Sequence, residues 1–261
     1  MRIGIDMSIV IVTGASSGIG EEFCRVLDSR GYDCIWLLAR RIDRLQDVSE
    51  HLHTATRVIP CDLTDRRDLE RLRIDIETHA PDIGMLVCCA GVGYFGMVTE
   101  YDPEEQHTMI DLNIGALTDT VSFCVPFMRE GSSIIALCSL SAYIPMPHLA
   151  VYSSTKAFVR QYCNSIRDEL RPRGIKDLEV SPGWVDTDFI NICKKNDVPD
   201  KVFSGMCTKE QVVEQAFKDL SKNRKRSCFG IRTKMRSFFG LHFNGFALRV
   251  WNGYWKRQSS R

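Results

Sequence analysis

Residues 8–20 read SIVIVTGASSGIG and join a short apolar run to a glycine-rich turn. Ser8–Thr13 is rich in β-branched residues, which is typical of a strand buried on both faces of a parallel sheet. The glycines allow a tight turn, and the helix expected from Gly18 presents free N–H groups that suit a pyrophosphate. A turn without a ligand is the alternative, but the position between a first strand and a first helix favours a dinucleotide site.

Strand and helix patterns alternate along most of the chain, which predicts a Rossmann-type doubly wound parallel sheet of about seven strands, flanked by helices. We expect a single domain over 1–221, with a substrate loop at about 188–206. In such sheets ligands bind beyond the carboxyl ends of the strands. The expected strands are 8–13, 34–39, 57–61, 83–89, 133–139, 178–181 and 227–231, and the expected helices are 18–30, 42–53, 64–79, 103–129, 151–170 and 209–220.

Composition narrows the class of protein. The net charge of +1 excludes a strong overall attraction to nucleic acid. The eleven cysteines show no CxxC pair and no metal-ligand spacing, so we expect no metal and a reducing, cytoplasmic location. We expect no signal peptide and no membrane span, because no apolar run approaches the required length.

Charge is unevenly distributed, because residues 222–261 hold eleven Lys and Arg but no Asp or Glu. From Phe238 onward apolar residues recur at helical spacing, although Gly245 and Gly253 weaken that pattern. We expect a basic, aromatic extension packed on the acidic body or on a partner subunit. Weak contact with a membrane surface is the alternative.

The end of the second expected strand indicates which cofactor is bound. An NAD site normally carries an acid there, whereas this chain has Arg40 and Arg41. An arginine can pair bidentately with a 2′-phosphate, which favours NADP(H) over NAD(H). The alternative is that both arginines are a solvated helix start.

A second motif, SLSAYIPMPHLAVYSSTK at 139–156, places Tyr152 and Lys156 one helical turn apart and Ser139 thirteen residues before the tyrosine. Tyr152 can donate a proton, Lys156 can lower its pKa of about 10, and Ser139 can hold a substrate oxygen. Ser141 is an alternative hydroxyl. A lone Tyr–Lys pair is more often a packed aromatic beside a solvated amine, but the upstream serine and nucleotide turn favour catalysis.

These motifs together resemble the classical short-chain dehydrogenase/reductase family over about residues 8–187. They occur in the family's order, and the closer resemblance is to the DltE-like branch of bacterial carbonyl reductases. One departure is Cys89, where the family usually has an asparagine that ties neighbouring strands. The motifs are TGASSGIG at 13–20, Asp62–Leu63, CCAG at 88–91, Asn113 in DLNIG, Ser139, YSSTK at 152–156 and PGWVDT at 182–187.

The resemblance implies roles for individual residues. Lys156 would also hold the nicotinamide ribose, and Asn113 a water in a proton relay. Asp62 would contact the adenine, and Val185 and Thr187 the carboxamide and phosphates. The implied catalytic set is Asn113, Ser139, Tyr152 and Lys156. The cofactor set is Gly14, Ser16, Ser17, Gly18, Ile19, Gly20, Arg40, Arg41, Asp62, Leu63, Ala90, Gly91, Asn113, Tyr152, Lys156, Pro182, Gly183, Val185 and Thr187.

We therefore expect an NADP(H)-dependent oxidoreductase that interconverts a secondary alcohol and a ketone, on a bulky apolar substrate such as a hydroxysteroid. Alternatives are a 3-oxoacyl thioester reductase, for which Lys194 and Lys195 are the basic candidates, and a non-catalytic NADPH-sensing regulator. By resemblance, the helices at 103–129 and 151–170 form a homodimer or homotetramer. The expected pocket wall is Tyr94, Phe95, Met97, Tyr143, Ile144, Met146, Trp184, Phe189 and Ile190.

Overall fold

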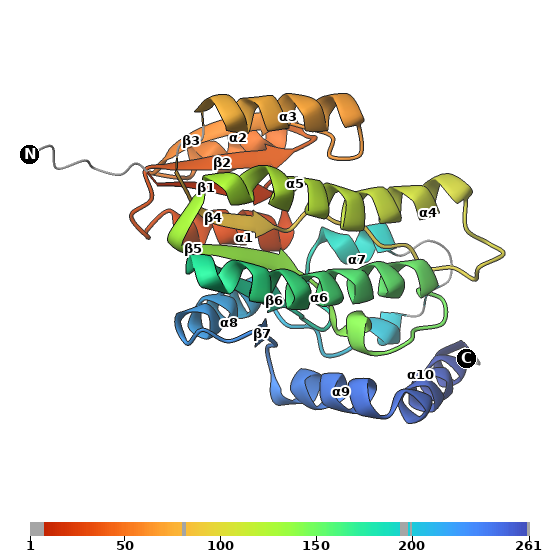
Figure 1. Cartoon of the computed structure of the whole chain (residues 1–261). Coiled ribbons are helices and arrows are strands. Elements are labelled where there is room, and N and C mark those ends of the chain that lie inside the picture. Colours follow the sequence, from red (N-terminus) through yellow and green to blue (C-terminus); the bar gives the residue numbers. More distant parts are fainter. Residues whose placement is uncertain (1–7, 80–81, 194–197, 199, 260–261) are drawn as a thin grey trace, which may run out of the picture.

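The computed structural model describes residues 8–79, 82–193, 198 and 200–259 and is built around one parallel sheet (Figure 1). The seven strands are in the order β3-β2-β1-β4-β5-β6-β7, and every neighbouring pair is parallel. This confirms the predicted doubly wound sheet. The strands are β1 Ile9–Thr13, β2 Cys34–Ala39, β3 Ala55–Pro60, β4 Ile83–Cys88, β5 Met128–Leu137, β6 Lys176–Val180 and β7 Arg226–Ser227.

The functional edge of the sheet follows from its strand order. β2 and β3 lie on one side of β1, and β4 crosses to the other side, so the order reverses between β1 and β4. The register aligns Thr13 with Leu38 on β2 and with Cys88 on β4, which brings these carboxyl ends level. A crevice at such a reversal is where ligands of this architecture bind.

Helices cover both faces of the sheet and enclose two apolar cores. One core contains residues of α3, α5 and α6, which lie in front of the sheet in Figure 1, and the other contains residues of α1, α2 and α8. All five residues of β1 are buried, as its unbroken apolar run predicts. The helices are α1 Gly18–Leu27, α2 Ile42–Glu50, α3 Arg66–His79, α4 Pro103–Ile110, α5 Ala116–Cys124, α6 Ala150–Leu170, α7 Asp188–Cys193 and α8 Lys209–Ser221.

The segment expected as one helix at 103–129 is helical from Pro103 to Phe127, but it is not a regular α-helix throughout. α4 passes into a π-helical turn at Asp111–Gly115, and α5 ends in a 3₁₀ turn at Val125–Phe127. Pro126 lies at the start of that turn and has no N–H for the helical ladder, so the chain leaves the helix there. β5 therefore begins at Met128, earlier than expected.

The basic extension forms two helices, α9 Ile231–His242 and α10 Asn244–Ser259, which lie below the sheet in Figure 1. The strand expected at 227–231 is only Arg226–Ser227, because Gly230 adopts φ +81° and α9 begins at Ile231. Nowhere in the described ranges does a helix have the length and apolarity needed to span a membrane.

Aromatic contacts seat the extension on the body. Trp251 Nε1 donates to the Pro147 carbonyl at 3.1 Å, and the Trp255 ring stacks on His148 with centroids 4.1 Å apart. The extension thus contacts the subunit's own body through aromatic side chains, and these contacts do not pair basic side chains with acids.

Candidate active site

A cavity of about 340 Å³ lies at the carboxyl ends of the central strands. It brings together residues that are far apart in sequence, including the turn after β1, the end of β2 and the start of α6. Every residue of the predicted catalytic and cofactor sets lines it except Asn113, whose neighbour Leu112 does.

The glycine turn at this cavity is packed too tightly for side chains. A Cβ on Gly20 would lie 2.2 Å from the Gly14 carbonyl oxygen, and one on Gly14, at φ +69°, would lie 2.8 Å from the Ala90 nitrogen. Ser17, the N-cap of α1, forms no side-chain cap bond, so it does not satisfy the first helical N–H groups. Free N–H groups beside a glycine cradle fit a pyrophosphate.

The two arginines after β2 lie at one end of the same cavity. Arg41 Nη2 donates to Ser16 Oγ at 3.3 Å and to Ser17 Oγ at 3.2 Å, so its guanidinium bridges to the glycine turn. Arg40 is exposed and also lines the cavity. This end of the site is therefore positively charged and open.

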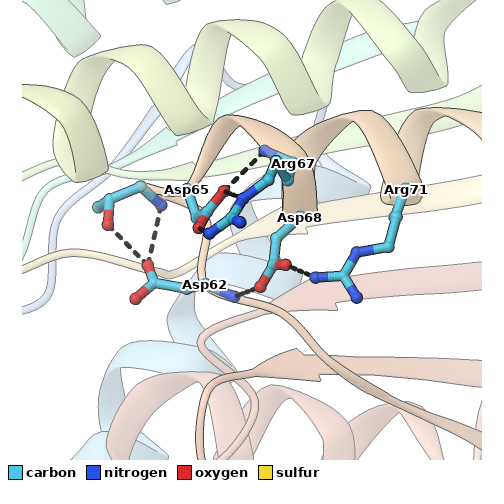
Figure 2. Close-up of polar contacts among 6 residues, drawn as sticks. Asp62, Asp65, Arg67, Asp68 and Arg71 are labelled. Atoms are coloured by element: carbon cyan, nitrogen blue, oxygen red, sulfur yellow. Dashed lines mark hydrogen bonds and ion pairs between the residues drawn. The ribbon is translucent and has the colours of Figure 1, made fainter.

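Asp62 follows β3 and is held by the turn before α3 (Figure 2). Its Oδ1 accepts from the Thr64 nitrogen at 2.9 Å and from Thr64 Oγ1 at 2.7 Å. Its own N–H donates to Asp68 Oδ2 at 2.8 Å, and Asp68 in turn pairs with Arg71. The carboxylate is thus fixed at the edge of the cavity that Cys61, Asp62 and Leu63 line.

Ser139, Tyr152 and Lys156 all line this cavity. Ser139 lies two residues beyond β5, as N-cap of the 3₁₀ helix η3 (Leu140–Tyr143), and its Oγ accepts from the Ser141 nitrogen at 3.1 Å. Tyr152 and Lys156 lie in the first turns of α6 and are buried. Lys156 Nζ donates to the Leu137 carbonyl at 2.8 Å, which fixes the amine at the end of β5.

The electrostatics of this trio differ from expectation. Burial raises the pKa of Tyr152, and hydrogen bonding with Ser139 only partly offsets it. Burial also lowers the pKa of Lys156. The amine lies 5.8 Å from the Tyr152 ring centroid, and the causes of the raised phenol pKa are burial first and the neighbouring Cys193 second. The neutral phenol, which can donate a proton, is therefore the form favoured in this structure.

Asn113 lies in the π-helical turn and has a role that the sequence did not reveal. Its Nδ2 donates to the Val92 carbonyl at 2.8 Å and to Thr155 Oγ1 at 3.0 Å, and its Oδ1 accepts from the Val92 nitrogen at 2.9 Å. The side chain therefore ties the chain leaving β4 to α6, which carries Tyr152.

The chain at Cys89 is still hydrogen-bonded to the neighbouring strand β1, although the expected asparagine is missing. Thr13 Oγ1 accepts from the nitrogens of Cys89 and Ala90, both at 3.2 Å, and so joins the ends of β1 and β4. The Cys89 side chain is buried in the apolar core beside α1. A threonine hydroxyl thus links the strands that an asparagine was expected to link.

A second cavity, of about 430 Å³, adjoins the first and shares Ser139, Tyr152, Gly183 and Trp184 with it. Of the expected pocket wall, only Ile144, Met146 and Trp184 line it. The opposite wall is formed by α9 and α10, which sequence reasoning missed. Its residues are Arg232, Met235, Arg236, Phe239, Phe246, Ala247, Val250 and Trp251.

The remaining expected wall residues lie elsewhere. Tyr143 is buried and donates to Glu179 instead of facing substrate. Phe189 lines the first cavity, and Phe95 packs between Trp255 and Phe203. Neither cavity is lined by Tyr94, Met97 or Ile190. Lys194 and Lys195 fall outside the described residues.

Comparisons with known proteins agree with this geometry. A family model described as short chain dehydrogenase matches residues 8–197. An oxidoreductase of Staphylococcus epidermidis is 34% identical over 181 residues, which cover 69% of this chain and 78% of that protein.

Two solved structures share the fold. A bulky-bulky ketone specific alcohol dehydrogenase from Comamonas testosteroni has a TM-score of 0.72 at 23% identity, over 85% of this chain and 86% of that one. A short-chain dehydrogenase from Sphingobium yanoikuyae in complex with NADPH has a TM-score of 0.77 at 23% identity, over 92% and 95% of the two chains.

Proposed function

The chain belongs to the short-chain dehydrogenase family, and from that membership we propose how its site interconverts a secondary alcohol and a ketone. It is an oxidoreductase of alcohol and ketone groups with a nicotinamide cofactor. The observation that carries the proposal is that Ser139, Tyr152 and Lys156 line the same cavity as the glycine cradle.

In this proposal, Ser139 Oγ and the Tyr152 hydroxyl bind the substrate oxygen from one side. Tyr152 donates its proton to that oxygen as a ketone is reduced, and its raised pKa keeps the proton in place beforehand. Lys156 and Asn113 position α6 and the ribose end of the site. The cofactor, when bound, supplies or accepts the hydride.

Replacing Tyr152 with phenylalanine tests the assignment. Tyr152→Phe keeps the ring and its packing but removes the proton, so we expect turnover to fall by about a thousandfold or more. Cofactor affinity, measured by fluorescence titration with NADPH, should stay within about twofold. A variant that retains full activity would remove Tyr152 from the mechanism.

We further propose that NADP(H) is preferred over NAD(H), supported by Arg40 and Arg41 at the open end of the cavity. A guanidinium that binds the 2′-phosphate contributes a charge-assisted hydrogen bond, so its loss should cost about tenfold to a hundredfold in affinity. Arg40→Gln should therefore raise KM for NADPH and leave KM for NADH unchanged. Equal efficiency of the two cofactors in the unaltered protein would contradict the preference.

For the substrate, we propose a bulky apolar alcohol or ketone, of which a hydroxysteroid is one example. The second cavity is lined mainly by apolar side chains and opens directly onto Ser139 and Tyr152. The ketone specificity in the name of the Comamonas testosteroni enzyme points the same way. A 3-oxoacyl thioester is the second candidate, and a panel of ketones distinguishes the two. The intact, buried Tyr152 and Lys156 disfavour a purely sensory protein.

We also propose that the chain forms a homodimer or homotetramer. Ile110 and Phe158 are exposed on the helices expected at the interface, and light scattering would measure the assembly.

We propose a cytoplasmic location and a division of the chain into two parts. All eleven cysteines are free thiols, which supports a reducing cytoplasm. Residues 1–221 would form the catalytic domain and 222–261 an extension, although Arg226–Ser227 pairs with β6. Exposed aromatic and basic residues of that extension support weak contact with an anionic membrane surface.

A further inference from the structure

Two arginines stand in the otherwise apolar wall that α9 contributes to the second cavity. Arg232 and Arg236 line it together with Met235 and Phe239. They are four residues apart, so they lie on the same face of the helix, one turn from each other. The cavity therefore combines an apolar body, a reaction end at Ser139 and Tyr152, and two adjacent positive charges.

The described part of the chain offers no pairing partner for either of these two guanidinium groups. Neither guanidinium has a hydrogen bond or an ion pair with another described residue. Arg232 also lies in the first turn of a helix, where a cation opposes the helix dipole. No Asp or Glu occurs between residues 222 and 261, so the local sequence offers no counter-ion.

The position of α9 is fixed by close contacts with the body, while Arg232 and Arg236 line the cavity as exposed residues. A Cβ on Gly240 would lie 2.6 Å from the Tyr143 carbonyl oxygen, which shows that α9 is seated directly on η3. At its other end, Thr233 Oγ1 lies 3.6 Å from the Cβ position of Gly183, a residue of both cavities. Arg236 lies between these two contacts along α9, and Arg232 directly precedes Thr233.

A third polar group in the same cavity is also without a partner. Ser141 is 5% exposed, and its Oγ has no hydrogen-bond partner among the described residues. It lines the second cavity beside Ser139. An unpaired buried hydroxyl is costly, but Ser141 Oγ is itself shielded from solvent, so it adds an unpaired polar atom to the wall and not an open contact for a ligand.

We propose that the second cavity binds carbonyl compounds, or the corresponding alcohols, that carry an acid group on an apolar body, with Arg232 and Arg236 binding that acid. This inference rests on the proposed oxidoreductase function and specifies its substrate class. Paired guanidiniums suit a carboxylate or phosphate because they offer several donors in a planar arrangement. Ile144, Met146 and Val250 line the apolar part of the cavity, where the body of the substrate would lie.

Matched substrates that differ only in charge test the proposal. A mid-chain oxo fatty acid and a ketosteroid acid are each compared with their methyl esters, with NADPH as the reductant. In the unaltered protein, we expect each acid to have the lower KM. In the Arg232→Gln/Arg236→Gln variant, KM for the acid should rise about tenfold or more, with little change in kcat, and KM for the ester should not change.

Lys234→Gln is the matched control, because Lys234 lies on the same helix but does not line the cavity. It removes one positive charge from the same surface and should leave both substrates unaffected. Equal effects of the arginine variant on acid and ester, or none on either, would overturn the proposal.

A further pair of substrates shows whether the acid group that the arginines bind is a phosphate or a carboxylate. A 3-oxoacyl-coenzyme A carries phosphates, whereas the same acyl group on N-acetylcysteamine carries none. If the charged substrate has the lower KM in this pair only, the arginines bind the phosphates of a thioester substrate. An effect limited to the free acids assigns them to a carboxylate.

A binding measurement separates this inference from the proposed function. Trp184 and Trp251 line the cavity, so quenching of their fluorescence reports occupancy without turnover. If no ketone is turned over but the acids still bind more tightly than their esters, and only with both arginines present, the proposed function fails and the anion site stands. If the esters are reduced as well as the acids, the anion site fails and the function stands.

Discussion

The ring of Tyr152 packs against the backbone of Gly93, which leaves no room for a side chain there. A Cβ on Gly93 would lie 2.7 Å from Tyr152 Cδ2 and 3.0 Å from Phe189 Cζ. Gly93 directly precedes Tyr94 and Phe95, which were expected in the pocket wall. The structure shows that its missing side chain sets the position of the proposed proton donor.

Gly93→Ala should therefore reduce turnover more than binding. Displacing the Tyr152 ring by a few tenths of an ångström to one ångström moves its hydroxyl from the substrate oxygen, which should lower kcat by about tenfold to a hundredfold. Steady-state kinetics with a ketone, with NADPH affinity measured separately, checks this. Gly96→Ala is the control, because its Cβ would meet Tyr101 at an ordinary 3.5 Å. Equal kcat in the two variants would contradict the argument.

At the scale of elements, α6 and β6 are joined by a buried ion pair. Arg167 Nη2 donates to Asp177 Oδ2 at 2.6 Å, and the carboxylate side chain is fully buried. Burial raises the pKa of Asp177 to about 7 from 3.8, because desolvation outweighs the attraction of Arg167.

This pKa makes stability depend on pH in a defined direction. Between about pH 4 and pH 7 the folded carboxyl keeps a proton that the unfolded one releases, so the contribution of Asp177 falls as pH rises. The free energy of unfolding, relative to that of Asp177→Asn, should fall by up to about 1.4 kcal/mol per pH unit across this window. Urea unfolding at several pH values measures it.

Asp65→Asn is the control for this experiment, because the hydrogen bonds from Arg67 lower the pKa of Asp65 to about 2. Its effect should be constant between about pH 4 and pH 7. Parallel stability curves for the unaltered protein and Asp177→Asn would show that Asp177 titrates normally.

The segment 103–129 shows why element boundaries were harder to predict than element types. Its apolar spacing is helical throughout, so periodicity alone indicates one helix. The π-helical turn is accompanied by the bonds of Asn113 to Val92 and Thr155, which lie 21 and 42 residues away. Such contacts leave no mark in the local pattern.

At the scale of the whole molecule, the basic extension has two faces. One lines the second cavity, and the other leaves large apolar side chains in solvent, with Phe238 and Phe243 more than half exposed at 54% and 53%. The extension that carries them, residues 222–261, holds eleven Lys and Arg but no Asp or Glu. A surface of this kind matches the headgroup region of an anionic bilayer.

Vesicle binding tests this surface. The unaltered protein should co-sediment with phosphatidylglycerol vesicles, less so at high salt, and should not bind phosphatidylcholine vesicles. Phe238→Ser/Phe243→Ser should weaken binding by about tenfold or more, because each ring loses its burial in the interface. Neither residue lines the second cavity, so turnover should be retained. Unchanged binding by this variant, or equal binding to the two lipids, would exclude the membrane proposal.

The sequence by itself determined the parallel sheet, the glycine turn and the meeting of Ser139, Tyr152 and Lys156. These depend on local backbone preferences and on the rule that parallel strands end at one edge. Only the tertiary structure decided that α9 and α10 form a cavity wall, that Tyr143 turns inward to Glu179, and that burial raises the pKa of Tyr152. Each of these is set by which distant residues pack together and how much water they exclude, and the spacing of residues along the chain does not record that.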